Sequence, residues 1–110
     1  MNLRQFLKDE FGIDFPISGG LGTSRENSII IHHTIPNDYT SVEYAILQCL
    51  GLGREIAWKL VQQLTLNHNE RTLDRLKIET TQVTEGEIIT QVENYYFDIT
   101  ECVGAHSCAF

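Results

Sequence analysis

The C-terminal segment "DITECVGAHSCAF" carries three side chains that can bind a metal ion or form a disulfide. Cys102, His106 and Cys108 lie within seven residues. A structural zinc site needs four ligands, usually in paired C-x2-C units, and Cys49 is a poor fourth ligand because it lies on the apolar face of a predicted helix. An odd number of cysteines with no export signal favours reduced thiols. We therefore predict no metal and no cofactor, with a zinc site and a Cys102–Cys108 disulfide as the alternatives.

The glycine-rich segment "SGGLGTSRENS" is the second candidate for chemistry. Its backbone amides could form an anion-binding nest, to which Ser24 and Arg25 would add donors and a positive charge. The segment lacks the lysine of a phosphate-binding Walker loop. A dinucleotide fingerprint would lead into a helix, whereas this segment leads into a predicted strand. A ligand-binding loop and a plain flexible connection are the two interpretations.

Two adjacent histidines, His32 and His33, follow a run of three isoleucines. Successive residues of a strand point to opposite faces, so both imidazoles cannot bind one ion in a regular strand. We take His33 as the candidate ligand-binding residue, and a surface or hydrogen-bonded role as the alternative. Spacing alone identifies no trio of Ser, His and Asp, so the sequence supports no catalytic assignment.

Aromatic side chains could line a pocket between helices and sheet, which is a common place for a small ligand. Trp58 and Tyr96 are the first residues to consider, and the alternative is that they belong to the core and its rim. The candidate ligand-binding residues are therefore Ser24, Arg25, His33, Trp58 and Tyr96.

The charge of the chain is concentrated in its last third. The formal net charge is −7, and residues 78–110 contain no Lys or Arg. Nucleic-acid binding draws much of its affinity from clustered Lys and Arg, so we expect no nucleic acid among the partners. An acidic surface could steer a basic protein partner, or it could simply keep a small domain soluble. The acidic residues of this region are Glu79, Glu85, Glu87, Glu93, Asp98 and Glu101.

Length and composition are typical of one globular domain covering residues 1–110. Hydrophobic residues make up 42% of the chain and charged residues 21%. No apolar run approaches the roughly 18 residues needed to cross a bilayer. We expect neither a signal peptide nor a membrane anchor, and hence a cytoplasmic protein.

The first half of the chain predicts helices around one strand. Apolar residues at helical spacing indicate a helix over residues 3–11, followed by a long loop and then a strand over residues 28–35. The sequence "TSVE" resembles a capping box that begins a helix at Thr40, and Gly51 would end it. A further helix is expected over residues 53–66, joined to the previous one by a short corner.

The second half predicts a long β-hairpin. Two runs with period 2, residues 72–83 and 88–100, flank a turn at Glu85 and Gly86. The apolar face of the second run changes side near Asn94. This change predicts either a β-bulge at that point or a sheet covered on both faces, one by helices and one by a partner subunit; we prefer the second.

Together these elements predict an α+β fold with the order α-β-α-α-β-β: an antiparallel sheet of about three strands with three helices mainly on one face. A long hairpin with an exposed edge is a common place for dimers to form. We therefore expect a homodimeric, non-catalytic protein-interaction module. The alternative is a small-molecule-binding or catalytic domain that uses the glycine-rich loop and a pocket between helices and sheet.

Overall fold

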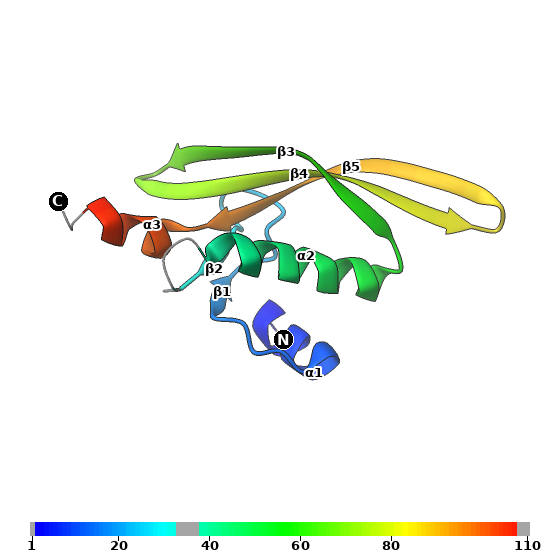
Figure 1. Ribbon diagram of the computed structural model, residues 1–110, viewed down its shortest axis with the longest axis horizontal. Coiled ribbons are helices and arrows are strands. Elements are labelled where there is room, and N and C mark those ends of the chain that lie inside the picture. Colours follow the sequence, from blue (N-terminus) through cyan, green and yellow to red (C-terminus); the bar gives the residue numbers. More distant parts are fainter. Residues whose placement is uncertain (1, 33–37, 108–110) are drawn as a thin grey trace.

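The computed structural model describes residues 2–32 and 38–107 of the chain. Its central feature is a five-stranded mixed sheet with the strand order β1-β2-β5-β4-β3 (Figure 1). The predicted three-stranded antiparallel sheet and its element order are therefore wrong. The elements in chain order are α1 (Leu3–Phe11), β1 (Ile17–Gly19), β2 (Ile29–Ile31), α2 (Tyr39–Arg54), β3 (Ala57–His68), β4 (Arg71–Thr84), β5 (Glu87–Asp98) and α3 (Thr100–Ser107).

The segment predicted as a helix over residues 53–66 is mostly strand β3. Trp58 and Leu60 point to the face that α2 covers, and Leu64 points to the opposite face, because a β-bulge between Leu60 and Gln62 shifts the register by one residue. A strand with period 2 and one inserted residue puts apolar residues at positions 60, 61 and 64. These are also neighbours on a helix, which is why the pattern resembled one.

Gly51 does not end the second helix as predicted. Helix α2 continues to Arg54, and Glu55 then adopts a left-handed conformation with φ of 57° that turns the chain into β3. A Cβ atom on Gly51 would lie 2.9 Å from Cδ1 of Trp58. The glycine therefore allows the Trp58 indole of β3 to pack closely against the helix.

The long hairpin of β4 and β5 confirms the predicted strands up to Asp98, whereas Thr100, predicted as the end of the second strand, begins α3. The two strands pair without a register shift from Leu73 opposite Asp98 to Thr84 opposite Glu87. Glu85 and Gly86 form the turn with φ values of 46° and 84°. The bulge near Asn94, the less preferred of the two interpretations, is therefore absent, and cover of the second face by a partner subunit stays a prediction.

Two short strands complete the sheet: β1 lies in the predicted long loop, and β2 lies in the strand predicted over residues 28–35. Strand β1 pairs with β2 in antiparallel orientation, and β2 lies parallel to β5 with Ile29 opposite Phe97. Of the strand predicted over residues 28–35, the structure confirms Ile29–Ile31, whereas residues 33–35 lie outside the described residues. Strands β1 and β3 are the two edges of the sheet.

The hydrophobic core lies between helices α1 and α2 and the inner face of the sheet, which we define as the face carrying Leu76 and Phe97. Arg54 at the end of α2 donates to both carboxylate oxygens of Glu93 on β5, at 2.6 and 2.7 Å. The hairpin extends well beyond this covered region, as Figure 1 shows. Among the described residues, no helix covers the opposite, outer face of β3, β4 and β5 (Figure 1). The core residues include Leu7, Ile17, Ile29, Ile31, Ile46, Leu47, Leu76, Ile78, Phe97 and Ile99.

Glu43 is part of the core instead of a capping box. Helix α2 begins at Tyr39 with Asp38 at the N-cap position, and Glu43 and Asp74 are 0% and 1% exposed. Burial and, second, the neighbouring Asp74 carboxyl raise the pKa of Glu43 to about 10. The Glu43 carboxyl is therefore protonated at neutral pH, while Asp74 accepts a hydrogen bond from Gln63 at 2.7 Å.

Candidate functional site

The structure separates the residues predicted to form one ligand site. Trp58 lies on the inner face of the sheet against α2, whereas Tyr96 lies on the outer face between the buried neighbours of β5. Ser24 and Arg25 belong to the loop between β1 and β2. His33 lies outside the described residues. Trp58 and Tyr96 therefore lie on opposite faces of the sheet and do not line one pocket, and a ligand-binding role for either stays a prediction.

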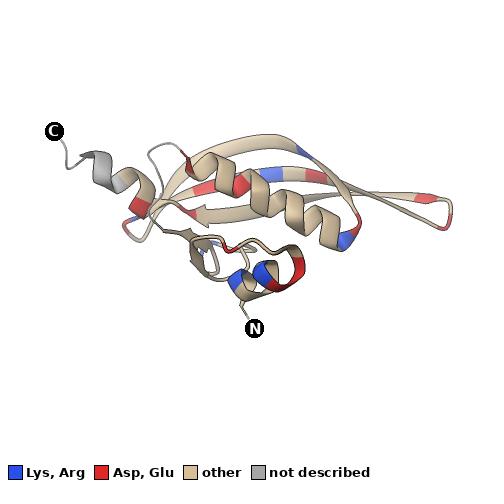
Figure 2. Ribbon diagram, turned by 60° about the horizontal axis from the view of Figure 1, so that its bottom comes forward, with Lys and Arg blue, Asp and Glu red and all other residues tan. Residues whose placement is uncertain are grey.

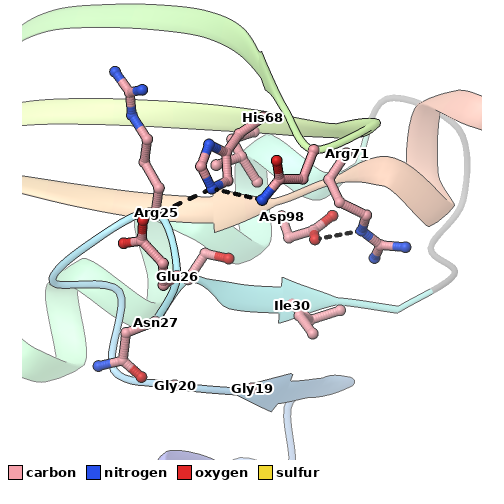
Figure 3. A pocket seen from close by; sticks show the side chains of 12 residues that line it. Gly19, Gly20, Arg25, Glu26, Asn27, Ile30, His68, Arg71 and Asp98 are labelled. Carbon is pink, nitrogen blue, oxygen red and sulfur yellow. Dashed lines mark hydrogen bonds and ion pairs between the residues drawn. The ribbon is translucent and has the colours of Figure 1, made fainter.

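Arg25 does line a hollow, of about 530 Å³, between the glycine-rich loop, the β3–β4 turn and the end of β5 (Figure 3). In Figure 3 the side chains of Arg25 and Arg71 extend in different directions, so the two cations do not converge on one point. Arg71 Nε donates to Asp98 at 2.8 Å, and His68 lies 3.8 Å from Glu26. Most of the charged side chains in the hollow are therefore paired with each other.

Asp98 is the most deeply buried charged group of this hollow. Burial alone would raise the pKa of its carboxyl, but hydrogen bonds from Arg71 and from Thr100 outweigh it and lower the pKa. The Thr100 hydroxyl donates at 2.6 Å, and its amide nitrogen donates at 3.0 Å. Asp98 therefore holds the start of α3 against β4 and β5, which is a structural task.

The acidic surface is smaller than the sequence suggests. Of the six acidic residues after position 77, four contact a cationic or imidazole group of the same chain. Glu85 and Glu87 remain, at the turn of the long hairpin, where Figure 2 shows them in red at the end of the arm. The four contacts are Glu79 with Lys59, Glu93 with Arg54, Asp98 with Arg71 and Glu101 with His32.

A hydrogen-bonded chain of Ser18, His32 and Glu101 is a cluster that sequence reasoning missed. Ser18 Oγ lies 2.7 Å from Nε2 of His32, and Nδ1 of the same imidazole lies 2.9 Å from Oε2 of Glu101. The three residues are 14 and 69 positions apart in the sequence. Spacing could not reveal the cluster, because it depends on the pairing of β1 with β2 and on the position of α3.

A second hollow, of about 210 Å³, lies beside Ser18. Residues of β1 form one wall and the first turn of α1 forms the other. The Asn2 side chain accepts a hydrogen bond from the amide of Gln5 at 2.8 Å and so fixes the beginning of the helix. The lining residues are Asn2, Leu3, Arg4, Ile17, Ser18 and Gly19.

The outer edge of β3 is long and almost without charge. Lys59 is the only Lys, Arg, Asp or Glu in this strand of 12 residues, and Figure 2 shows the strand almost entirely in the neutral colour. Proteins usually protect exposed edges with charges, prolines or bulges, because unpaired backbone groups attract another strand. Lys59 and the bulge at Val61 protect the first part of the edge, and residues 62–68 lack any such feature.

The hydrogen bonds of β4 show which groups of β3 face the open edge. Thr72 uses its amide on Thr100 Oγ1 and its carbonyl on the amide of Ile99, and so directs both away from β3. The pair of Asn67 and Thr72 is therefore not hydrogen-bonded. Because paired positions alternate in an antiparallel ladder, Gln63, Thr65 and Asn67 turn their backbone donors and acceptors outward.

Large apolar side chains are exposed in two regions of the sheet. One region is on β3, and the other is on the distal part of the β4–β5 hairpin, which extends beyond the region that α2 covers (Figure 1). Apolar patches of this kind are typical of interaction surfaces. The exposed residues are Leu60, Val61, Leu64, Val83, Ile88, Ile89 and Val92.

The C-terminal cysteine-rich segment is helical where the structure describes it. Cys102 is buried, and its Sγ lies 3.6 Å from the carbonyl oxygens of Ile31 and His32. Cys108 lies outside the described residues. Among the residues that are described, no group of three or more His, Cys, Asp or Glu side chains could hold a metal ion. No helix among the described residues is long and apolar enough to cross a membrane.

Comparison of the chain with family models, curated proteins and solved structures finds no match. Inferences about function therefore rest on the geometry of the described residues. Two features carry them: the open edge of β3 and the hydrogen-bonded cluster of Ser18, His32 and Glu101.

Proposed function

We propose that the protein is a protein-interaction module that acts as a homodimer, joined by antiparallel pairing of the β3 edges. The supporting observation is the edge itself: residues 62–68 present outward-facing backbone groups with no Asp, Glu, Lys or Arg among them. A second copy of the same edge offers a matching row of donors and acceptors about a two-fold axis. Pairing would satisfy both rows and convert two five-stranded sheets into one continuous sheet.

Charge favours this edge for self-association. Each chain has a formal net charge of −7, so two copies repel each other over most of their surfaces. Strand β3 carries no acidic residue, and its single Lys59 lies 3.4 Å from Glu79 of the same chain. The β3 edge is therefore a place where two acidic chains can approach without bringing like charges together.

The side chains of β3 favour one register. With the two-fold axis at Thr65, Gln63 of one copy lies opposite Asn67 of the other, and Leu64 lies opposite Leu66. The first pair joins two amide side chains on the inner face, and the second joins two leucines on the outer face. Apolar cross-strand pairs of this kind each contribute roughly 0.2–1 kcal/mol. The exposed side chain of Leu64, 45% accessible in the single chain, would become covered.

Thr65→Pro provides the most direct test. The Thr65 amide faces the open edge, so proline should remove a dimer hydrogen bond without removing one from the monomer. We expect wild type to sediment at about twice the 12.5 kDa of one chain in analytical ultracentrifugation, and Thr65→Pro to sediment as a monomer. Thr65→Val, which keeps the amide, is the matched control and should remain dimeric.

A second variant keeps the proposal testable if proline disturbs the strand. Leu64→Glu changes an exposed side chain and places a carboxylate near its copy across the proposed axis. It should also give a monomer, with a circular dichroism spectrum like that of wild type. A monomeric wild type at about 100 µM, or a dimer that persists in both variants, would contradict the proposal.

A further inference from the structure

We infer that Ser18 is the nucleophile of an acyl-transfer site, with His32 as its general base and Glu101 as the residue that orients the imidazole. The site lies by β1, at the opposite edge of the sheet from β3. It is therefore independent of the proposed dimer contact. The inference rests on the two contacts of the His32 ring: one nitrogen lies beside the Ser18 hydroxyl, and the other lies beside the Glu101 carboxylate.

The two hydrogen bonds of His32 fix its role. Nε2 lies 2.7 Å from Ser18 Oγ, and Nδ1 lies 2.9 Å from the Glu101 carboxylate. A carboxylate at Nδ1 favours a proton on that nitrogen, which leaves the Nε2 lone pair to accept the serine proton. Nucleophile, base and orienting acid thus stand in the order found in serine hydrolases, a geometry that recurs on unrelated folds.

Local structure explains why these residues meet. Pro16 accepts a hydrogen bond from the amide of His32 at 2.8 Å, so the pairing of β1 with β2 places Ser18 diagonally beside His32 on one face. Helix α3 begins at Thr100 and brings Glu101 to the other side of the ring. The side chains of His32 and Glu101 are 39% and 34% exposed, and Ser18 is exposed, so a substrate can reach the hydroxyl.

Backbone amides beside Ser18 can stabilise a negative charge. Gly20 donates to Ser28 and His32 donates to Pro16, so by the alternation of the ladder the Gly19 amide points away from β2. Gly19 also lines the 210 Å³ hollow, whose far wall is the N-terminal turn of α1. Helix N-terminal amides favour anions. An oxyanion formed on the Ser18 side of the hollow would therefore lie beside the Gly19 amide, and the N-terminal turn of α1 would add a favourable electrostatic potential from the far wall.

The reaction that fits this arrangement is hydrolysis of a short acyl ester. Ser18 Oγ forms a bond to the acyl carbon while its proton passes to Nε2 of His32, and the carbonyl oxygen becomes the oxyanion. The bond to the leaving alcohol then breaks, and the proton passes from Nε2 to that alcohol. Water, deprotonated by His32, attacks the acyl-enzyme and releases the acid, which restores the Ser18 hydroxyl.

The hollow limits the size of the acyl group. Its volume of about 210 Å³ lies below the usual range for drug-sized ligand pockets. Leu3 and Ile17 contribute apolar walls, and Arg4 adds a cationic rim. We therefore expect short, unbranched acyl groups to be accepted and long-chain esters to be rejected.

Labelling with a fluorophosphonate probe tests the nucleophile directly. Intact mass spectrometry of the wild-type chain should show one adduct per chain, and peptide mapping should place it on Ser18. Ser18→Ala should lose the adduct. His32→Gln should slow the labelling roughly 100-fold, the usual contribution of a general base. Ser41→Ala, which changes an exposed serine of α2, is the matched control and should label like wild type.

Turnover of p-nitrophenyl butyrate supplies the second measurement. Wild type should release a burst of one p-nitrophenol per chain, and Ser18→Ala should lose it, which separates serine chemistry from hydrolysis by imidazole alone. Glu101→Gln should reduce the burst rate by at least about 10-fold while circular dichroism stays unchanged. Labelling spread over several serines, no adduct on Ser18, or an unaffected rate in His32→Gln would each overturn the inference.

Discussion

The two halves of the β4–β5 hairpin share one uninterrupted register but differ in what covers them. On the inner face of the proximal half, Leu76 and Phe97 are fully buried under the helices, whereas Ile89 on the same face of the distal half is 40% exposed. On the outer face of the distal half, Val83 and Ile88 are 70% and 71% exposed. Backbone pairing is the same in both halves. Strand pairing and core formation are therefore separate properties of this hairpin: the turn and the alternation of residues fix the first, and helix packing fixes the second.

Element lengths explain where the cover ends. Helix α2 has 16 residues and strand β4 has 14. At about 1.5 Å per residue in a helix and about 3.4 Å in a strand, the helix spans about 24 Å and the strand about 48 Å. One helix along the sheet can therefore cover only about half of the hairpin. The overhang explains why the inner-face residue Ile89 is exposed, whereas Ile88 and Val92 lie on the outer face, which α2 does not cover.

The largest effect should come from removing a core side chain of the proximal half. Phe97→Ala should lower the free energy of unfolding by about 3–5 kcal/mol, because Phe97 is completely buried and its loss leaves a cavity. Ile88→Ala, in the distal half of the same strand, should change it by less than about 0.5 kcal/mol. Urea unfolding followed by circular dichroism measures both.

Equal effects of Phe97→Ala and Ile88→Ala would contradict this prediction. Equal losses in the two variants would mean that the distal half is covered in solution and that the exposed hairpin is not the state of the free protein. The measurement should be repeated at several protein concentrations, because a dimer contact would make the loss from Ile88→Ala concentration-dependent.

The buried acid of the proximal half should give an intermediate effect. The folded state holds the Glu43 proton up to a pKa of about 10, whereas the unfolded chain releases it near 4.5. Below pH 4.5 both states hold this proton and the contribution of Glu43 to stability is greatest; as pH rises from 4.5 to 10 that contribution is lost. Glu43→Gln, which cannot ionise, should be more stable than wild type at pH 7 by up to about 3 kcal/mol, because pH 7 lies 2.5 units above 4.5 and each unit corresponds to about 1.4 kcal/mol.

Thermal unfolding from pH 4 to pH 9 distinguishes this effect from general acid stabilisation. The difference between wild type and Glu43→Gln should grow as pH rises. Glu87→Gln, which neutralises an exposed glutamate of the distal half, serves as the control and should follow wild type across the range. A difference that does not change with pH would rule out a buried, protonated Glu43.

The smallest effect should be at the distal turn. Glu85 adopts a φ of 46° and Gly86 a φ of 84°, the positive values of a type I′ turn, for which Asn-Gly is preferred. Glu85→Asn should stabilise the hairpin end by about 0.5 kcal/mol. Hydrogen exchange should show slower exchange of distal amides and no change near Phe97. Glu85→Gln removes the charge without favouring positive φ, and an equal effect there would assign the gain to charge.

Part of the fold followed from local pattern. Residues 3–11 have helical spacing and a glycine stop, and the hairpin has two alternating runs around a Glu-Gly turn; both elements were predicted and both are confirmed. Strands β1 and β2, of three residues each, are too short for a period to show. Strand β3 was mistaken for a helix, because the bulge at Val61 places its apolar residues at helical spacing.

The candidate sites depended still more on tertiary structure. Arg25 was predicted as a ligand-binding residue and lines the hollow of Figure 3, but Trp58 and Tyr96 lie on opposite faces of the sheet. The cluster of Ser18, His32 and Glu101 joins residues up to 83 positions apart, counted from 18 to 101. No local sequence pattern predicts contacts between residues so far apart in the chain, because these contacts depend on the order of the strands in the sheet.

By itself the sequence determined the local conformations that depend on neighbours: the first helix, the long hairpin and its turn, and a charge excess in the last third. Tertiary structure decided which of those charges remain available, because internal partners bind four of the six acidic residues there. It also decided that one edge of the sheet stays open and that a serine, a histidine and a glutamate meet beside the other. These outcomes depend on contacts between distant segments, which form only when the core selects one packing of the elements.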